Sequence, residues 1–230
     1  MFIRVKEQSD DIELKQLALH SEATCELMCG NSNAIIELLK DIKPVPPSKF
    51  LLSQAYLMND EIKEAKMQLQ ESMYFSILEL FGAFPLYFTV CSDNADTYKE
   101  MCRRAVVLIE TFNLKKIAPA TIMPFYIAAA QGFATTGNMD EAIKVLEDYT
   151  DFVTGDIYPL ELVNSDEVFD LIKESASKKA NHGITDLPSD ERRIKQNMAS
   201  AVIENPAFAC LFEDLRFKAL AEKLINNAKA

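Results

Sequence analysis

The sequence predicts an all-α fold, and three observations support this. The chain has 230 residues, 49% hydrophobic and 26% charged, a composition typical of globular domains and unlike that of disordered tails or fibres. It has only 6 Gly and 9 Pro, few for a β-sandwich or barrel with many turns. Apolar residues recur at helical spacing along most of the chain, and one segment is repeated.

The repeat consists of residues 47–75 and residues 124–152, which align without a gap at an offset of 77 residues. The identical pairs are Pro47/Pro124, Gln54/Gln131, Glu64/Glu141, Ala65/Ala142, Leu69/Leu146 and Phe75/Phe152. Tyr56 also aligns with Phe133, which keeps an aromatic ring at that position.

Each copy has the pattern of a helical hairpin. Pro47 and Pro124 suit the first turn of a helix, where no amide hydrogen is needed. Gly137-Asn138 ends the first helix of the second copy, and acidic residues open its second helix, where they complement the helix dipole. We expect one apolar face on that second helix, made of Ala142, Leu146, Tyr149 and Val153.

An atypical repeat is expected between the two copies, over residues 78–112. Its first helix would run from Leu78 to Cys91 with a kink or break between Gly82 and Pro85. Its second helix would run from Ala95 to Phe112 after a turn at residues 92–94. The expected apolar stripe of this second helix is Tyr98, Met101, Ala105, Leu108 and Phe112.

Further helices are predicted on both flanks. Residues 10–28 form one, and a second runs over residues 33–42 with Ser32 as its cap. Ser189 caps another helix near the carboxyl end. The apolar face of the 10–28 helix is predicted as Leu14, Leu17, Ala18, Ser21, Cys25 and Met28.

The long irregular segment 154–188 contains one short predicted helix, at residues 166–175. Irregular segments of this length are functional in some proteins and tolerated insertions in others. After it and the helix capped by Ser189, new helical segments are expected to begin at Asn205-Pro206 and at Asp214.

In this order and spacing the residues resemble the tetratricopeptide repeat (TPR). The resemblance covers Tyr126 to Tyr149 and, with Asp60 in place of the turn glycine, residues 49–72. The segment 189–226 resembles the capping unit that closes some bacterial TPR arrays. The resemblance implies a TPR-like α-α superhelix, a single solenoid domain over residues 1–230.

A wider resemblance is to the helical sensor half of helix-turn-helix transcription regulators from Gram-positive bacteria. It is carried by Ala128-Ala-Ala-Gln-Gly-Phe133, Asp148-Tyr-Thr-Asp-Phe152 and Asn205-Pro-Ala-Phe208. Such proteins place a DNA-binding domain first, whereas this chain starts almost directly with its repeats. We therefore expect either a sensor domain separated from its DNA reader or a stand-alone relative that binds proteins.

Charge and composition limit the partners. The net charge is −11 and the pI about 4.8, which disfavours direct binding of nucleic acid or of anionic membranes. The apolar stretch from Met73 to Cys91 contains Glu79 and Pro85, so we expect a buried helix rather than a membrane span. The five cysteines lack regular spacing and no signal-peptide pattern is present. A cytoplasmic protein with reduced thiols is therefore expected.

Residues suited to catalysis are few. His20 and His182 are the only histidines, and His182 stands in a turn-like sequence. Cys25 and Cys29 are expected to be small core residues rather than metal ligands. No catalytic residue, metal or cofactor is predicted, and we expect no enzyme. A metal held by His20, Cys25 and Cys29 would reopen that question.

In TPR arrays the first helices of successive hairpins line a concave groove, and ligands lie in it. The resemblance places Phe50, Gln54, Leu57 and Met58 on that surface in one copy, and Ile127, Gln131, Ala134 and Thr135 in the other. A glutamine amide both donates and accepts, so it can pair with an extended peptide backbone. Tyr87 and Tyr126 are candidate aromatic walls, although core packing is the preferred interpretation for each of them.

The predicted peptide-binding residues are Phe50, Gln54, Met58, Tyr87, Ile127, Gln131 and Thr135. The predicted partner is a peptide or protein lying in this groove. The alternative is a stand-alone dimerisation or scaffold protein, in which a homodimer forms through apolar surface on the outer helices.

Overall fold

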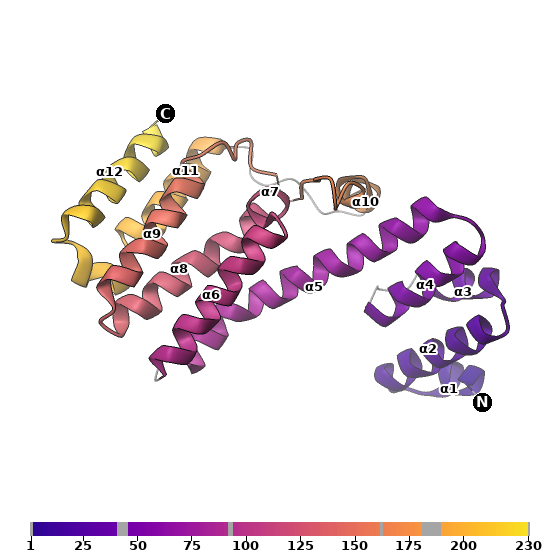
Figure 1. The fold of residues 1–230 in the computed structure, drawn as a ribbon. Helices are drawn as coiled ribbons and strands as arrows, with labels where there is room; N and C mark the ends of the chain where they lie inside the picture. Colours follow the sequence, from indigo (N-terminus) through magenta and orange to yellow (C-terminus); the bar gives the residue numbers. More distant parts are fainter. Residues whose placement is uncertain (1, 41–45, 92–93, 162, 181–189, 230) are drawn as a thin grey trace. The chain divides into compact units, whose positions relative to one another are not determined.

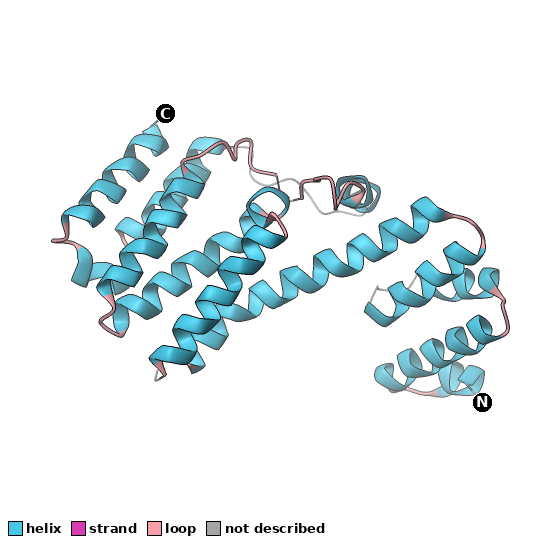
Figure 2. Ribbon diagram, in the orientation of Figure 1, coloured by secondary structure: helices cyan, strands magenta, loops and turns pink. Residues whose placement is uncertain are grey.

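The structure, a computed structural model, describes residues 2–40, 46–91, 94–161, 163–180 and 190–229. Throughout these residues the secondary structure is helical, with twelve α-helices, one short 3-10 helix and no strand. Figure 1 gives the order of the helices, and Figure 2 shows that only loops and turns connect them. The predicted all-α class is confirmed.

The chain divides into two compact units, residues 1–77 and residues 78–230. The division falls inside a single helix, α5 (Ile62–Val90), whose first half belongs to unit 1 and whose second half belongs to unit 2. The prediction of one solenoid domain over residues 1–230 concerns how these units combine, and it stays a prediction.

Unit 1 is a set of short helices packed in chain order. Its helices before α5 are α1 (Phe2–Gln8), α2 (Ile12–Met28), α3 (Ser32–Leu39) and α4 (Pro46–Met58). Helix α2 packs against α1, α3 and α4, and α3 packs against α4. The buried core of these helices is made of Ala23, Ile35, Leu39, Leu52 and Ala55.

One type of turn occurs three times, with its central residue at positive φ. That residue is Gly30 (φ 78°), Asp60 (φ 59°) or Gly137 (φ 80°). Each turn carries the same two hydrogen bonds, from the central amide to the carbonyl three residues back and from the next amide to the carbonyl five residues back. This is the Schellman pattern that satisfies the last carbonyls of a helix.

The turns at Asp60 and Gly137 occupy equivalent positions in the two aligned segments. Their bonds are Asp60–Leu57 and Glu61–Tyr56 in the first, and Gly137–Ala134 and Asn138–Phe133 in the second, with N–O distances of 2.9 to 3.2 Å. The matching bonds show that the two aligned segments reverse the chain in the same way.

Unit 2 contains the second half of α5 and the remaining helices. These are α6 (Ala95–Thr111), α7 (Leu114–Ile117), α8 (Pro119–Thr135), α9 (Met139–Val153), α10 (Ile172–Ala180), α11 (Glu191–Ile203), η1 (Pro206–Leu211) and α12 (Leu215–Lys229). Helix α9 packs against α8, α11 and α12. The apolar face predicted for the second helix of this hairpin is confirmed, because Ala142, Leu146, Tyr149 and Val153 are all buried.

Aromatic rings form the centre of unit 2. Phe81, Phe84 and Phe88 project from α5 and pack on Phe125 of α8, with centroid separations of 5.6 to 5.8 Å. Tyr98 of α6 lies between Phe88 (4.8 Å) and Phe133 (4.9 Å). These rings join three helices of the unit through offset and edge-to-face contacts.

Helix α5 differs from the prediction in two ways. The sequence predicted separate helices ending near Phe75 and beginning at Leu78, but the helix runs unbroken from Ile62 to Val90 with Pro85 inside it. The residues between the two predicted helices, Ser76 and Ile77, include no helix breaker, so nothing stops the first helix there.

The second difference is burial. Within the described residues, α5 is the one helix long and apolar enough to cross a membrane, and 22% of its most apolar 18-residue window is buried. The expectation of a buried helix is therefore wrong for most of this window. Tyr74, Phe81, Phe84 and Phe88 are the buried aromatic residues of this apolar stretch.

Several predicted helix ends are also corrected. Pro124 lies inside α8, which begins five residues earlier with Pro119 in its first turn. The hydroxyl of Ser32 bonds Asn59 instead of capping α3. Asp190 caps α11, while Ser189 lies outside the described residues. The helix predicted at residues 166–175 begins only at Ile172.

The apolar face predicted for α2 is mostly wrong, although Ala18 on that face is buried. Leu14, Leu17 and Met28 are exposed, whereas Leu19 and Leu27 pack against the core with Ala23 between them. Leucines occur on both sides of this helix, so periodicity alone does not identify the inward side. On α6 the predicted stripe is partly correct, since Tyr98 and Ala105 are buried and Met101 and Leu108 are half-buried.

Candidate functional site

Helix α4 in unit 1 exposes three of the predicted ligand-binding residues on one side. Phe50, Gln54 and Met58 follow one another at intervals of four residues, which places them on the same helix face. Phe50 is 50% exposed and Met58 47% exposed, and the neighbouring Leu57 is 50% exposed. We call Phe50, Gln54, Leu57 and Met58 the α4 face.

The opposite side of α4 is fixed in unit 1. Leu52 and Ala55 are part of its apolar core. Lys49, also buried, forms an ion pair with Glu71 of α5 and donates a hydrogen bond of 3.0 Å from Nζ to Oε1 of Gln68. A buried charge is tolerated only where it is paired. The α4 face is therefore held outward by both apolar and ionic contacts beneath it.

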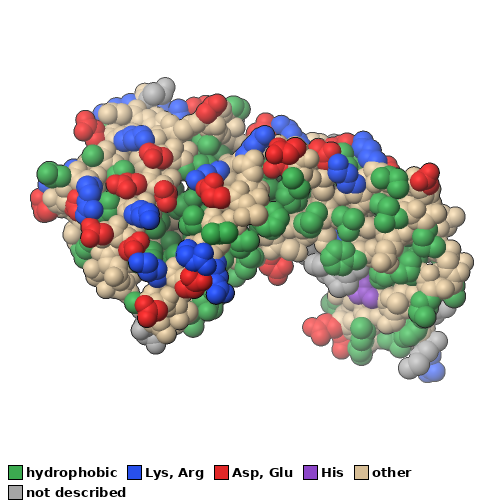
Figure 3. Space-filling view, in the orientation of Figure 1, with side chains coloured by type: hydrophobic (Ala, Val, Ile, Leu, Met, Phe, Trp, Pro, Cys, Tyr) green, Lys and Arg blue, Asp and Glu red, His purple; other side chains and the backbone are tan. Residues whose placement is uncertain are grey.

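Figure 3 shows how this surface differs from the rest of the visible side of the molecule. Acidic and basic side chains are intermixed over α6, α9 and α12, whereas hydrophobic side chains gather over α4 and the adjoining part of α5. The α5 residues Met73 and Phe75 are also exposed. Clustered apolar surface of this kind is typical of interaction sites.

The equivalent residues of unit 2 lie on α8 and are less accessible. Ile127 and Gln131 are half-buried, and Thr135 is exposed. The Thr135 hydroxyl donates to the carbonyl of Gly132 at 3.1 Å. Ala134 is only 4% exposed, so its predicted place on the ligand surface is wrong.

The two tyrosines considered as aromatic walls have different environments. Tyr126 is buried in unit 2, and burial raises the pKa of its phenol to about 12. Tyr87 is 40% exposed on α5, and its hydrogen bond with Cys91 raises its pKa. Tyr126 is thus a core residue, and Tyr87 remains available to a ligand.

The structure brings the predicted site residues together in two groups, each within one unit. Phe50, Gln54 and Met58 share a face of α4 in unit 1, and Ile127, Gln131 and Thr135 lie on one side of α8 in unit 2. Tyr87 lies in unit 2 on α5.

The residues considered for chemistry do not form a shared site within the described part of the chain. Cys25 and Cys29 are exposed, so the expectation that they are core residues is wrong. His20 is half-buried, with Nε2 bonded to the hydroxyl of Ser48. His182 lies outside the described residues. Over those residues, no three His, Cys, Asp or Glu side chains are grouped so as to hold a metal ion.

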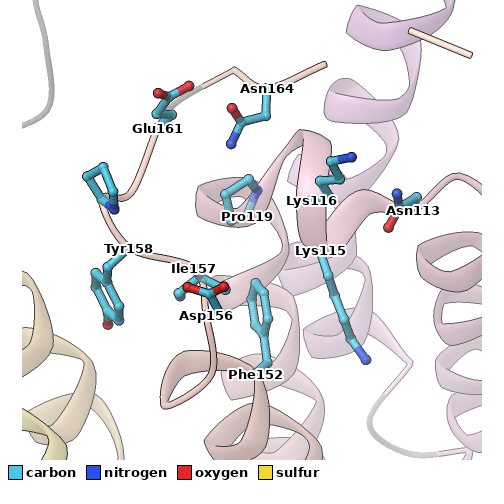
Figure 4. Close-up of a pocket in the computed structure, with 11 residues that line it drawn as sticks. Asn113, Lys115, Lys116, Pro119, Phe152, Asp156, Ile157, Tyr158, Glu161 and Asn164 are labelled. Carbon is cyan, nitrogen blue, oxygen red and sulfur yellow. The ribbon is translucent and has the colours of Figure 1, made fainter. Parts of the chain in front are cut away.

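A pocket in unit 2 was not predicted from the sequence. Its volume is about 550 Å³, and its lining residues are Asn113, Lys115, Lys116, Pro119, Phe152, Asp156, Ile157, Tyr158, Pro159, Glu161 and Asn164. Figure 4 shows that they come from α7, from the ends of α8 and α9, and from the segment that follows α9. The long irregular stretch after residue 153 was the available signal, since such segments often build sites.

Charged groups beside the pocket influence one another. Asp148, an exposed residue of α9, has a raised pKa because its carboxylate is partly desolvated, and the charges of Lys115 and Lys144 oppose that rise. For Lys115, burial lowers the pKa, but its hydrogen bond with Glu110 and the nearby charges of Tyr126, Glu110 and Asp148 more than offset this, so the pKa is raised.

Comparison of the chain with protein-family models, with curated proteins and with solved structures found no match.

Proposed function

We propose that this protein is a TPR-like helical module that binds a peptide or protein segment and performs no chemistry. The observation that carries the proposal is the α4 face: two apolar side chains about half exposed, Phe50 and Met58, with Gln54 between them on one helix side. Apolar contacts supply affinity, and an amide placed between them can pair with a peptide backbone.

The repeated hairpin supports the TPR-like part of the proposal. The aligned segments share their turn geometry, and the small residues Ser53, Ala65, Ala130 and Ala142 are all buried. Small buried residues at these places allow the two helices of each hairpin to approach closely. The proposed arrangement is a solenoid whose first helices carry the ligand surface.

Within that proposal, the module is the ligand-sensing or interaction part of a bacterial transcription regulator acting in the cytoplasm. The acidic net charge of −11 favours protein ligands over direct contact with nucleic acid. A second candidate is a dimerisation or scaffold protein. It is favoured by the exposed apolar side chains on α5, among them Leu80, Leu86 and Val90.

The test begins with peptides selected from a random display library against the full chain. Their affinity is then measured by fluorescence polarisation for the wild type, Gln54→Ala, Gln131→Ala and the double variant. Loss of one backbone hydrogen bond costs about 0.5 to 1.5 kcal/mol, so we expect Gln54→Ala to weaken binding by about twofold to about twelvefold. The smaller effect is expected for the half-buried Gln131.

The matched control is Gln196→Ala, on an exposed position of α11 away from both groups. It should leave affinity unchanged, and all the variants should keep the melting temperature of the wild type within about 2 °C, because surface substitutions rarely exceed ±0.5 kcal/mol. A library that yields no binder, or binders insensitive to Gln54→Ala, contradicts the proposal. A large loss of thermal stability in Gln54→Ala would place that residue in the core instead.

A further inference from the structure

The pocket of unit 2 is a second candidate binding site, separate from the α4 face. Its volume of about 550 Å³ falls within the range of about 300 to 1,000 Å³ that is usual for small-molecule sites. Such sites combine an apolar lining with a few polar groups that orient the ligand. Both are present here.

The segment after α9 that lines the pocket, from Asp156 to Asn164, contacts three neighbouring helices. The hydroxyl of Tyr158 donates to the carbonyl of Val153 at 3.1 Å, and Nζ of Lys195 lies 4.8 Å from the centroid of the Tyr158 ring. The backbone amide of Asn164 donates to the carbonyl of Ile117 at 3.2 Å. These contacts tie the segment to α9, α11 and α7, so the wall is preorganised before a ligand arrives.

The floor of the pocket is apolar. Phe152 and Pro119 are buried, and Ile157 is half-buried. In Figure 4 Phe152 and Pro119 lie between the α7 residues and the segment after α9, and Ile157 is on that segment. The floor therefore suits an aliphatic or aromatic group of a ligand.

Two of the four charged lining residues already have partners. Lys115 pairs with Glu110 at 2.9 Å, and its side chain extends away from Glu161 and Asn164 in Figure 4. Glu161 pairs with Lys173 at 2.5 Å. Lys116 and Asp156 have no ion pair with another residue of the described chain.

Lys116 and Asp156 come from different walls. Lys116 stands in the last turn of α7, and Asp156 follows α9. A site with one cation, one anion and an apolar floor matches a ligand that carries both charges. A polyanion such as a nucleotide would meet the carboxylates of Asp156 and Glu161, which disfavour it.

We propose that this pocket binds a small zwitterion of the amino-acid class, with its carboxylate at Lys116, its ammonium at Asp156 and its apolar side chain on Phe152, Pro119 and Ile157. The side-chain amide of Asn164, which points toward Pro119 in Figure 4, supplies a further hydrogen bond to the carboxylate. The site lies wholly in unit 2, so it does not depend on peptide binding at the α4 face.

The test is an NMR titration of the full chain with three matched probes. These are L-phenylalanine, its amide, which lacks the carboxylate, and N-acetyl-L-phenylalanine, which lacks the ammonium. Titration runs to about 10 mM, because ligands of this size commonly reach a Kd near 1 mM. We expect saturable shifts with phenylalanine and at least tenfold weaker binding of the two derivatives.

Two variants test which lining residue binds which charged group of the ligand. Lys116→Gln should reduce phenylalanine binding to the level of the amide and leave the amide unaffected. Asp156→Asn should reduce it to the level of the N-acetyl derivative. Lys144→Gln and Asp10→Asn, exposed charges outside the lining, should change nothing.

Three results would overturn the proposal. The first is that neither phenylalanine nor leucine, a second amino acid with an apolar side chain, shows saturable binding. The second is equal binding of all three probes, which would mean that the pocket binds apolar groups and does not recognise the charges of the ligand. The third is equal loss in the Lys144→Gln control and the Lys116→Gln variant, which would mean that only the overall charge matters.

Discussion

At the scale of single residues, close contacts distinguish positions that look equivalent in the sequence. Gly132 aligns with Ala55, and both are small. Only Gly132 faces Tyr98, whose hydroxyl donates to the carbonyls of Ala128 and Ala129 at 3.0 and 2.8 Å. A Cβ at position 132 would overlap the hydroxyl and ring carbons of that tyrosine.

Gly132→Ala is therefore expected to destabilise unit 2. The Tyr98 ring is buried between Phe88 and Phe133 and has little freedom to move aside. Overpacking of this kind costs about 1 to 3 kcal/mol, measured by chemical denaturation. The matched control is Gly82→Ala in α5, where no atom lies within 4 Å of the added Cβ.

The control substitution should change the free energy of unfolding in the opposite direction. Alanine is a better helix former than glycine by about 0.5 to 1 kcal/mol, so Gly82→Ala should raise stability. Equal effects of the two substitutions would show that Tyr98 does not occupy the space beside Gly132.

The buried ion pair of unit 1 gives a second prediction at this scale. Lys49→Met removes the cation beside Glu71, which stays buried, and breaking such a pair costs about 3 to 5 kcal/mol. The double variant Lys49→Met/Glu71→Leu should recover most of that loss, because it removes both charges. Urea unfolding of the three proteins measures the difference. A double variant no more stable than Lys49→Met would indicate that the pair is not the source of the loss.

At the scale of elements, the turn at positive φ is the feature that the two hairpins share. Asp60 adopts φ 59° where Gly137 adopts φ 80°. An aspartate tolerates the left-handed region better than most residues, yet glycine has no steric cost there. Asp60→Gly should stabilise the turn by a few tenths to about 1 kcal/mol.

The reciprocal change tests the equivalence of the turns. Gly137→Ala should destabilise by about 1 kcal/mol, because it forces a Cβ into the left-handed region. Differential scanning calorimetry of both variants measures the two effects. A loss in Asp60→Gly, or no effect of Gly137→Ala, would contradict a common turn geometry.

The elements also show what the sequence reveals and what it hides. The hairpin from α8 to α9 was predictable, because glycine marks its turn and α9 has a single apolar face. Helices α2 and α5 have leucine, methionine or aromatic residues on several sides, so periodicity does not identify which side is buried. Pro124 misled the placement of a helix start because an apolar helical turn, headed by Pro119, precedes it.

The two candidate sites were predictable to different degrees, because only one of them lies on a single helix with regular spacing. Helical spacing places Phe50, Gln54 and Met58 on one face of α4, and the resemblance to TPR arrays implies that this face carries the ligand. The pocket of unit 2 combines Asn113, Lys116 and Phe152 with residues of an irregular segment, and no periodicity links such positions. Only tertiary contacts, such as Asn164 with Ile117, bring them together.

At the scale of the whole molecule, the protein is helical throughout its described residues, and we propose one binding surface in each of its two units. The α4 face is apolar with a single amide, and the pocket of unit 2 is open to solvent, with one charge of each sign that has no ion pair among the described residues. The two surfaces suit ligands of different size, an extended chain and a small zwitterion.

The most direct test of the α4 face uses the methyl groups of methionine in the full chain. With ¹³C-methyl methionine, a peptide selected from the display library is titrated, and the signals of Met58 and Met28 are followed. Met58 is part of the α4 face, whereas Met28 is 84% exposed at the end of α2 and serves as the control. We predict a saturable shift of the Met58 methyl with the Met28 methyl unchanged. Binding that shifts Met28, or that saturates while Met58 stays in place, would contradict the proposed ligand surface.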